Sequence, residues 1–153
     1  MNIILYFILI ILLVFIDQIS KFYIVKNVAY ASKIVIIENF FNITNIKNTG
    51  GGFSILQDQT LFLSIISSVA VIVLIYFIIK DKNRFNRICY SLLCAGALGN
   101  LIDRIRLKYV VDFLDFYIFG YDFPVFNLAD TYITIAAGLI IIKSIIESKN
   151  ATN

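Results

Sequence analysis

Histidine is absent from this chain of 153 residues. A protein without histidine builds no Ser-His or Cys-His nucleophile pair and no His-Glu-x-x-His zinc site. Membrane hydrolases of the serine-histidine and zinc kinds are therefore excluded. Three options remain: carboxylate chemistry, a serine activated by lysine, or no chemistry at all.

Charged residues are scarce as well. They make up 15% of the chain, whereas hydrophobic residues make up 60% and the mean hydropathy is +0.89. An ordinary soluble domain has about 25% charged residues, so the composition predicts an integral membrane protein. Since each spanning helix needs roughly 20 apolar residues, we expect residues 1–153 to form one domain with four spans.

Basic residues and cysteines are few. The net charge of +3 favours contact with anionic membrane lipids, and the sequence has no basic cluster typical of nucleic-acid-binding proteins. We therefore expect membrane lipids, and no nucleic acid, among the partners. Cys89 and Cys94 lie in one apolar run, where helix packing explains them better than a disulfide or a metal site.

Apolar runs predict the spans, at about residues 3–24, 61–79, 88–104 and 128–146. The first lacks a basic start and a small-x-small cleavage site, so we expect an uncleaved span. The basic loop at residues 80–87 favours a cytoplasmic position, although basic residues near the opposite face leave the charge count nearly balanced. An even number of spans predicts that both termini lie on one side, which we take to be the cytoplasm.

Between the first two spans, β-branched and aromatic residues cluster at positions 33–38 and 40–46, which is typical of strands. Three glycines at positions 50–52 follow Asn48 and Thr49 and predict a turn. This turn is either a flexible hairpin tip or a loop that approaches a substrate. We expect a small sheet, at about residues 30–58, lying at the membrane surface.

Polar side chains gather near the ends of two spans. Asp17 and Lys21 are four residues apart and share one helix face, either as a simple ion pair or as part of a site. Asn100, Asp103 and Arg104 also share a face and can form a hydrogen-bonded cluster. The alternative is that Asp103 and Arg104 only mark the water boundary.

Two further aspartates lie in apolar surroundings, Asp112 in Val-Val-Asp-Phe and Asp130 in Phe-Asn-Leu-Ala-Asp. A carboxylate beside hydrocarbon is costly to ionise, so such groups tend to be paired, protonated or functional. We expect these two to carry the chemistry. The alternative for Asp130 is a capping box, in which Asn127 caps the last span and Asp130 occupies its third position.

The chain resembles the lipoprotein signal peptidases, or signal peptidase II, over nearly its whole length. The resemblance rests on blocks that occur in the family's order, at residues 17–21, 48–54, 96–104, 110–113 and 126–130. Any one block is a weak signal, whereas five together are specific. One departure is the pair Gly51 and Gly52, where relatives commonly have alanine.

The resemblance implies an aspartic endopeptidase in the bacterial inner membrane, with Asp112 and Asp130 as its catalytic pair. It also implies a fold of four membrane helices with a small extracytoplasmic β-cradle, and an active site near the outer face. The substrates would be diacylglyceryl-modified prolipoproteins, cut just before the lipidated cysteine. Because two carboxyl groups are enough for this chemistry, we expect no metal and no cofactor. We also expect the protein to act as a monomer. The supporting positions of the family map onto Asp17, Lys21, Asn48, Gly96, Asn100, Asp103, Arg104 and Asn127.

Other functions are open at this point. The polar residues could line the pathway of a small transporter or channel subunit, or belong to a non-catalytic scaffold. A transporter predicts polar residues throughout the bilayer, whereas these gather at one end of the spans. A serine-lysine peptidase would use Ser20 or Ser54, but Ser20 is adjacent to Lys21, a poor helical geometry for proton exchange.

Overall fold

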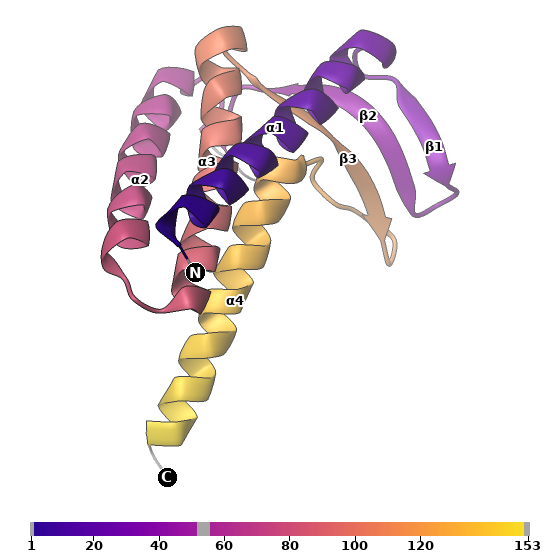
Figure 1. Ribbon diagram of the computed structural model, residues 1–153. Coiled ribbons are helices and arrows are strands. Elements are labelled where there is room, and N and C mark those ends of the chain that lie inside the picture. Colours follow the sequence, from indigo (N-terminus) through magenta and orange to yellow (C-terminus); the bar gives the residue numbers. More distant parts are fainter. Residues whose placement is uncertain (1, 52–55, 152–153) are drawn as a thin grey trace.

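The computed structural model describes residues 2–51 and 56–151. Within these residues the chain forms helices and strands in the order α1 (Ile3–Asn27), β1 (Lys33–Ile37), β2 (Phe41–Asn48), α2 (Thr60–Lys80), α3 (Arg84–Leu107), β3 (Val110–Ile118), β4 (Tyr121–Asp122) and α4 (Leu128–Ala151) (Figure 1). Gly52, Phe53 and Ser54, which belong to one of the motif blocks, lie outside the described residues.

The helices are each long and apolar enough to cross a membrane. Every predicted span lies inside an observed helix, and the helices extend further into polar sequence. Asn2 begins α1 by accepting a hydrogen bond from Ile4 N at 3.2 Å, and Asn83 begins α3 in the same way through Asn86 N. Such a cap satisfies backbone groups that the first turn leaves free, so α3 begins before its apolar run.

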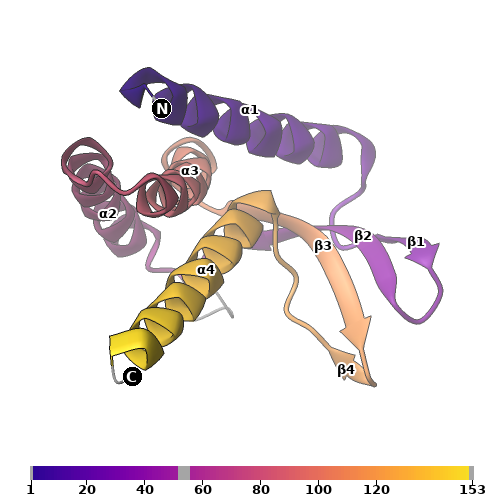
Figure 2. The same ribbon diagram turned by 60° about the horizontal axis from the view of Figure 1, so that its bottom comes forward.

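The helix α3 lies at the centre of the bundle. In its most apolar window 56% of the residues are buried, against 11% for α2, although α2 has the higher mean hydropathy. Figure 2 shows α3 between α2 and α4, with α1 across one side. Small residues such as Ala95 and Gly96 let neighbouring helices approach it closely. Cys89 and Cys94 are free and buried in this packing.

The sheet is antiparallel, with the strand order β1-β2-β3-β4. The predicted sheet at about residues 30–58 was therefore wrong in extent, because half of its strands come from residues 110–122. The helices α2 and α3 form a hairpin that returns the chain to the side it left. There Thr60 Oγ1 donates to Lys108 O at 3.0 Å, so β3 starts beside the end of β2.

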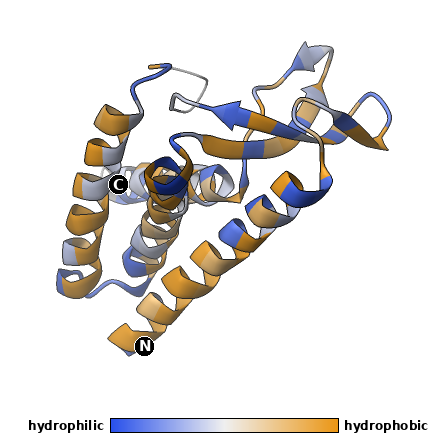
Figure 3. Ribbon diagram, turned by 90° about the horizontal axis from the view of Figure 1, so that it is seen from above, coloured by the Kyte–Doolittle hydropathy of each residue, from blue (hydrophilic) through white to orange (hydrophobic). Residues whose placement is uncertain are grey.

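The sheet joins the bundle where α1 ends. Ile24 of α1 and Val28, the residue after this helix, pack against Val111 and Phe113 of β3 in one buried apolar cluster. Coloured by hydropathy, α1 is uniformly hydrophobic near its start and mixed toward this junction (Figure 3). The polar part of α1 therefore lies next to the sheet and to the first turn of α4.

Candidate functional site

Asp112 lies near the start of β3 and is 2% exposed. Both carboxylate oxygens accept amide hydrogen bonds, Oδ2 from Asn48 Nδ2 at 2.9 Å and Oδ1 from Asn127 Nδ2 at 2.6 Å. Within the described part of the chain, no lysine or arginine forms an ion pair with it. Asp112 is thus a buried carboxyl group that is hydrogen-bonded without direct neutralisation.

Asp130 lies in the first turn of α4 and forms a capping box with Asn127. Its backbone N donates to Asn127 Oδ1 at 3.0 Å, and Asn127 N donates to Asp130 Oδ2 at 3.3 Å. The remaining oxygen, Oδ1, accepts a hydrogen bond from Asn100 Nδ2 at 2.8 Å. The predicted capping geometry is therefore present, and this cap also holds Asp130 in the polar cluster around Asp112.

The fully buried Asn127 links the two aspartates, since its side chain donates to Asp112 and its backbone to Asp130. The segment before it runs beside β3: Leu114 N donates to Phe126 O at 2.8 Å, and Phe126 N donates to Leu114 O at 3.1 Å. This pairing brings together two carboxylates that are eighteen residues apart in sequence, which spacing alone does not predict.

Burial raises the pKa of Asp112 from 3.8 to about 7, and the negative charge of Asp130 acts in the same direction. The hydrogen bonds from Asn48 and Asn127 and the charge of Lys21 act in the opposite direction. Near neutral pH the group is therefore poised between its protonated and ionised forms, as a proton donor or acceptor in catalysis requires.

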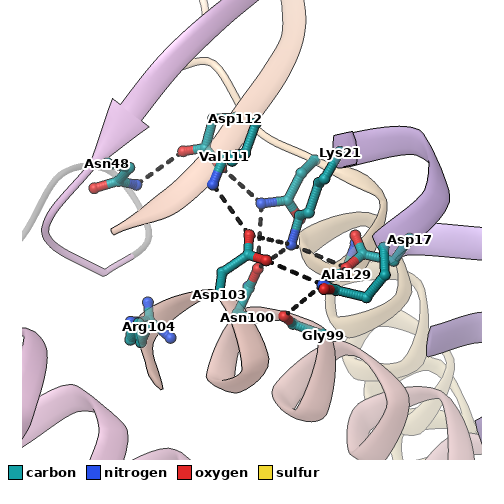
Figure 4. Close-up of polar contacts among 12 residues, drawn as sticks. Asp17, Lys21, Asn48, Gly99, Asn100, Asp103, Arg104, Val111, Asp112 and Ala129 are labelled. Atoms are coloured by element: carbon teal, nitrogen blue, oxygen red, sulfur yellow. Dashed lines mark hydrogen bonds and ion pairs between the residues drawn. The ribbon is translucent and has the colours of Figure 1, made fainter. Parts of the chain in front are cut away.

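Lys21 of α1 is the centre of a buried ionic cluster next to the aspartates (Figure 4). Its Nζ lies 2.9 Å from Asp17 Oδ2 and 3.1 Å from Asp103 Oδ2, and donates to Asn100 Oδ1 at 3.0 Å. These partners match the three donors of an ammonium group. The predicted polar face of α3 and the predicted pair on α1 thus meet in one network.

The carboxylates of this cluster also hold the backbone beside each aspartate. Asp103 Oδ2 accepts a hydrogen bond at 3.1 Å from Val111 N, the residue before Asp112. Asp17 Oδ1 accepts one at 3.0 Å from Ala129 N, the residue before Asp130. The ionic cluster therefore fixes β3 and α4 relative to each other.

Arg104 lies on the other side of the site and is 8% exposed. Its Nη2 donates to Gly50 O at 3.1 Å, while its Nε has no partner among the described residues. Asn48 accepts a hydrogen bond from Gly50 N at 2.9 Å, so the residues after β2 are held at both sides. The charge of Arg104 acts on both aspartates, Asp112 and Asp130.

Gly96 permits the close approach of α3 and α4. A Cβ atom there would lie 2.6 Å from Ile133 Cγ1 and would also collide with the carbonyl oxygen of Ala129. A larger residue would therefore push α4, with Asp130, away from α3.

Two residues of the network were not predicted as site residues. Gln18 Nε2 donates to Asp103 Oδ1 at 3.0 Å and to Gly99 O at 3.1 Å. A Cβ atom on Gly99 would lie 2.6 Å from Asp17 Oδ2, so only glycine leaves room for this carboxylate. The signal for Gln18 was its place directly after Asp17 in a motif block.

Ser20 and Lys21 are not arranged as the serine-lysine alternative requires. Ser20 Oγ donates to the carbonyl oxygen of Asp17 in its own helix at 2.7 Å, and Lys21 is occupied by the ionic cluster. Ser54 lies outside the described residues. Among the residues that the structure describes, no group of three or more His, Cys, Asp or Glu is placed to hold a metal ion.

A family model described as signal peptidase (SPase) II matches residues 9–146. The chain belongs to the signal peptidase II family. A lipoprotein signal peptidase of Staphylococcus aureus (strain JH9) is 45% identical over 136 residues, which are 88% of this chain and 83% of that protein. The resemblance that the motif blocks predicted is therefore confirmed.

Two solved structures, both described as bacterial membrane enzymes, have the same fold as this signal peptidase II chain. One, at 2.3 Å resolution, has a TM-score of 0.89 and 41% identity, and the match covers 95% of this chain and 90% of the other. The second, at 1.9 Å resolution, has a TM-score of 0.82 and 43% identity, with 90% of each chain covered. The predicted membrane fold with a small sheet is thus confirmed.

Proposed function

We propose that the protein is an aspartic endopeptidase that removes the signal peptide from diacylglyceryl-modified prolipoproteins, with Asp112 and Asp130 as its catalytic pair. The observation that carries the proposal is the position of Asn127, whose amide groups donate to both carboxylates. Membership of the signal peptidase II family supports signal peptide removal from prolipoproteins. The absence of histidine from the sequence excludes the Ser-His and Cys-His mechanisms.

In this mechanism the pair shares one proton, because like charges at short range resist full ionisation. We assign the proton to Asp112, whose pKa is raised to about 7. Asp130 accepts a proton from water as the water oxygen bonds to the scissile carbonyl carbon, and Asp112 protonates the carbonyl oxygen. When the C–N bond breaks, Asp130 passes its proton to the leaving amine and Asp112 regains one from the intermediate.

The supporting residues position the pair in this proposal. The ionic cluster of Asp17, Lys21 and Asp103 holds the backbone beside each aspartate. Asn48, Asn100 and Asn127 orient the carboxylates, Gly96 permits the approach of α4, and Arg104 adds positive charge beside the site. The mechanism needs no cofactor and no metal, and the whole set lies on one chain, in line with a monomer.

We place the protein in the bacterial inner membrane with its active site near the outer face and both termini in the cytoplasm. Figure 1 supports this arrangement, since the α2–α3 loop and the C-terminus lie at the end of the bundle opposite the sheet. That loop is basic, which favours the cytoplasmic side. A cysteine placed at Asn86 should then be labelled only from the cytoplasm. Labelling only from outside the cell would show that the proposed orientation is inverted.

The lipid on the substrate has a physical role in this proposal. Burial of an acyl chain adds about 0.8 kcal/mol per CH2 group, far from the reacting bond. A substrate held by its acyl chains in the outer leaflet would present the bond before its lipidated cysteine to the aspartates. The enzyme is therefore expected to discriminate strongly against precursors that lack the diacylglyceryl group.

The rival transporter function predicts polar groups along the full length of the bundle. Here the buried charged groups cluster near the sheet, and Lys21 is fully paired. The remaining length of the helices is lined by apolar contacts, including Tyr6, Ile10, Val71 and Ile78. This distribution favours chemistry at one membrane face over conduction.

The experiment is a cleavage assay with purified, folded protein in detergent micelles. A synthetic precursor peptide carrying a diacylglyceryl cysteine is expected to be cut at the bond before that cysteine. Mass spectrometry should then detect the two fragments on either side of this bond. The same peptide without lipid is the matched control and is expected to remain intact. Failure of folded protein to cut the lipidated peptide would contradict the proposed function and favour a non-catalytic scaffold.

A further inference from the structure

The pairing of β2 with β3 contains one extra residue on β2. Ile43 lies opposite Leu114, whereas Ile46 lies opposite Asp112, so three steps along β2 correspond to two along β3. The two residues between Ile43 and Ile46 therefore form a β-bulge opposite Phe113. A bulge of this kind bends the strand and changes which side chains share a face.

This bulge determines which part of β2 faces Asp112. Phe41 and Asn48 are seven residues apart, so a regular strand would point them to opposite faces. Their partners on β3, Phe116 and Val110, are six residues apart and share a face. Because the bulge absorbs one residue, Phe41 stacks on Phe116 with ring centroids 4.5 Å apart, while Asn48 reaches Asp112 on the same face.

The bulge residues are Thr44 and Asn45, and both are buried. Thr44 Oγ1 donates to Ser32 O at 2.7 Å, and Asn45 Nδ2 donates to Val28 O at 2.8 Å. The backbone of Asn45 accepts a further bond from Ala31 N at 2.9 Å. These partners belong to the connection between α1 and β1, so this connection holds both side chains of the bulge.

We propose that Thr44 and Asn45 are positioning residues of the active site, because their bulge fixes the register in which Asn48 meets Asp112. Their side-chain hydrogen bonds go to Ser32 and Val28 and not to the aspartates, so in this proposal they act through Asn48. Without their hydrogen bonds, β2 gains from regular pairing and slips by one residue, which turns Lys47 toward Asp112 and Asn48 away. The activity measurements that follow rest on the proposed function.

Point substitutions test the hydrogen bonds. Asn45→Leu and Thr44→Val remove them, and Thr44→Ser keeps the hydroxyl as the matched control. We expect the first two to lower kcat about tenfold to hundredfold, as misplacement by about 1 Å does elsewhere, while Thr44→Ser stays near the parent. Asn42→Ala, on the opposite face of β2 before the bulge, is expected to leave kcat unchanged.

The pH profile gives a readout that a general loss of stability does not move. The hydrogen bond from Asn48 lowers the pKa of Asp112, so its loss moves the limb that reports Asp112 to higher pH. The slip also brings the ammonium group of Lys47 to the face of Asp112, which would lower its pKa. The comparison is therefore made on a Lys47→Gln background, where Asn45→Leu and Asn48→Ala are expected to move this limb alike, and the double variant to move it no further. On that background the charges that act on Asp112, from Asp130, Lys21 and Arg104, are the same in every variant.

Deletion of Asn45 tests separately the effect of the β2–β3 register and the effect of the hydrogen bond from Asn45 to Val28. Without an extra residue β2 pairs regularly, and Asn48 stays opposite Val110 on the face of Asp112. We therefore expect the deletion variant to keep the parental pH limb although it lacks the bond to Val28. A deletion variant with the limb of Asn48→Ala would overturn the proposal.

The outcomes also separate the two proposals. If the parent cuts no lipidated peptide, the proposed function fails. If the parent cuts it and Asn45→Leu keeps both kcat and the pH limb, only the positioning proposal fails. Should Asn45→Leu not fold, Thr44→Val against Thr44→Ser decides in the same way.

Discussion

Asp112 and Asp115 are buried aspartates of the same strand, 2% and 1% exposed, yet they point to opposite faces of β3 and have different partners. Asp115 forms an ion pair with Lys33 Nζ at 2.8 Å and accepts a hydrogen bond from Asn42 Nδ2 at 3.3 Å. Asp112 receives two neutral amides and has Asp130 as its neighbour.

The two aspartates differ in whether a nearby cation neutralises the buried carboxylate. A buried carboxylate beside a cation is neutralised, which is sufficient for a structural role. A buried carboxyl group without an ion pair and next to a second carboxylate costs free energy that structure alone does not require. Asp112 therefore has the environment of a reactive group and Asp115 that of a structural one, although both lie in the same apolar segment of the sequence.

The largest expected effect is on turnover when the second member of the pair is changed. Asp130→Asn should lower kcat by on the order of a thousandfold or more, because an amide can neither accept a proton from water nor return it. The pair acts as a unit, so adding Asp112→Asn should hardly lower kcat further. Cleavage of a lipidated precursor measures both; substantial turnover by Asp130→Asn would break the assignment.

A smaller loss is expected for the ionic cluster. Asp103→Asn weakens the contact with Lys21 but leaves an oxygen for Val111 N, so we expect kcat to fall about tenfold without a change in the pH limbs. The pH profile of the cleavage rate checks this. Movement of both limbs would mean that Asp103 itself titrates with the reaction, and the cluster would then belong to the chemistry.

Stability should respond to pH through Asp112. Its pKa is raised from 3.8 to about 7 in the folded protein, so the folded state binds more protons than the unfolded state in this range. The sign follows: the contribution of Asp112 to stability is greatest at low pH and falls as the pH rises from about 4 to 7. Thermal unfolding in micelles at pH 5 and pH 8 should show this fall for the parent and much less of it for Asp112→Asn. Equal falls in both proteins would contradict the raised pKa.

The smallest effect on turnover is expected on the Asp115 side. The side chain of Lys33 is 55% exposed, so solvent screens its charge, but Lys33→Gln leaves the buried Asp115 without an ion pair. The substitution should therefore cost about 1–3 kcal/mol of stability. Turnover should stay unchanged, because this face of the strand does not reach the aspartate pair. Chemical unfolding and the cleavage assay check the two parts. A large loss of turnover would erase the contrast between the two faces.

Much of the membrane part could be predicted from the sequence. The apolar runs gave the spans because lipid demands about 20 apolar residues in each. The capping box of Asn127 and Asp130 was legible because its spacing is local. The position of Asp112 next to Asp130 came from the family resemblance, since no local rule connects residues eighteen apart.

The sheet shows where such prediction stops. Strand β3 pairs with β2 across the whole α2–α3 hairpin, and aromatic residues at 109–126 do not reveal that partner. Once β3 is missed, the opposite faces of Asp112 and Asp115 cannot be assigned. The bulge at Thr44 and Asn45 is also invisible to a rule of strict alternation, so the contact of Asn48 with Asp112 could not be derived.

The most direct test compares Asp112→Asn with Asp115→Asn in the same cleavage assay, on protein shown to be folded by thermal unfolding. Both substitutions replace one buried carboxyl group of β3 with an amide of nearly the same volume. The account predicts that Asp112→Asn loses nearly all turnover of a lipidated precursor, with stability within about 2 kcal/mol of the parent because one amide donor loses its acceptor. It predicts that Asp115→Asn keeps parental kcat. The catalytic role of Asp112 would be contradicted if Asp112→Asn kept its turnover. It would also be contradicted if only Asp115→Asn lost turnover.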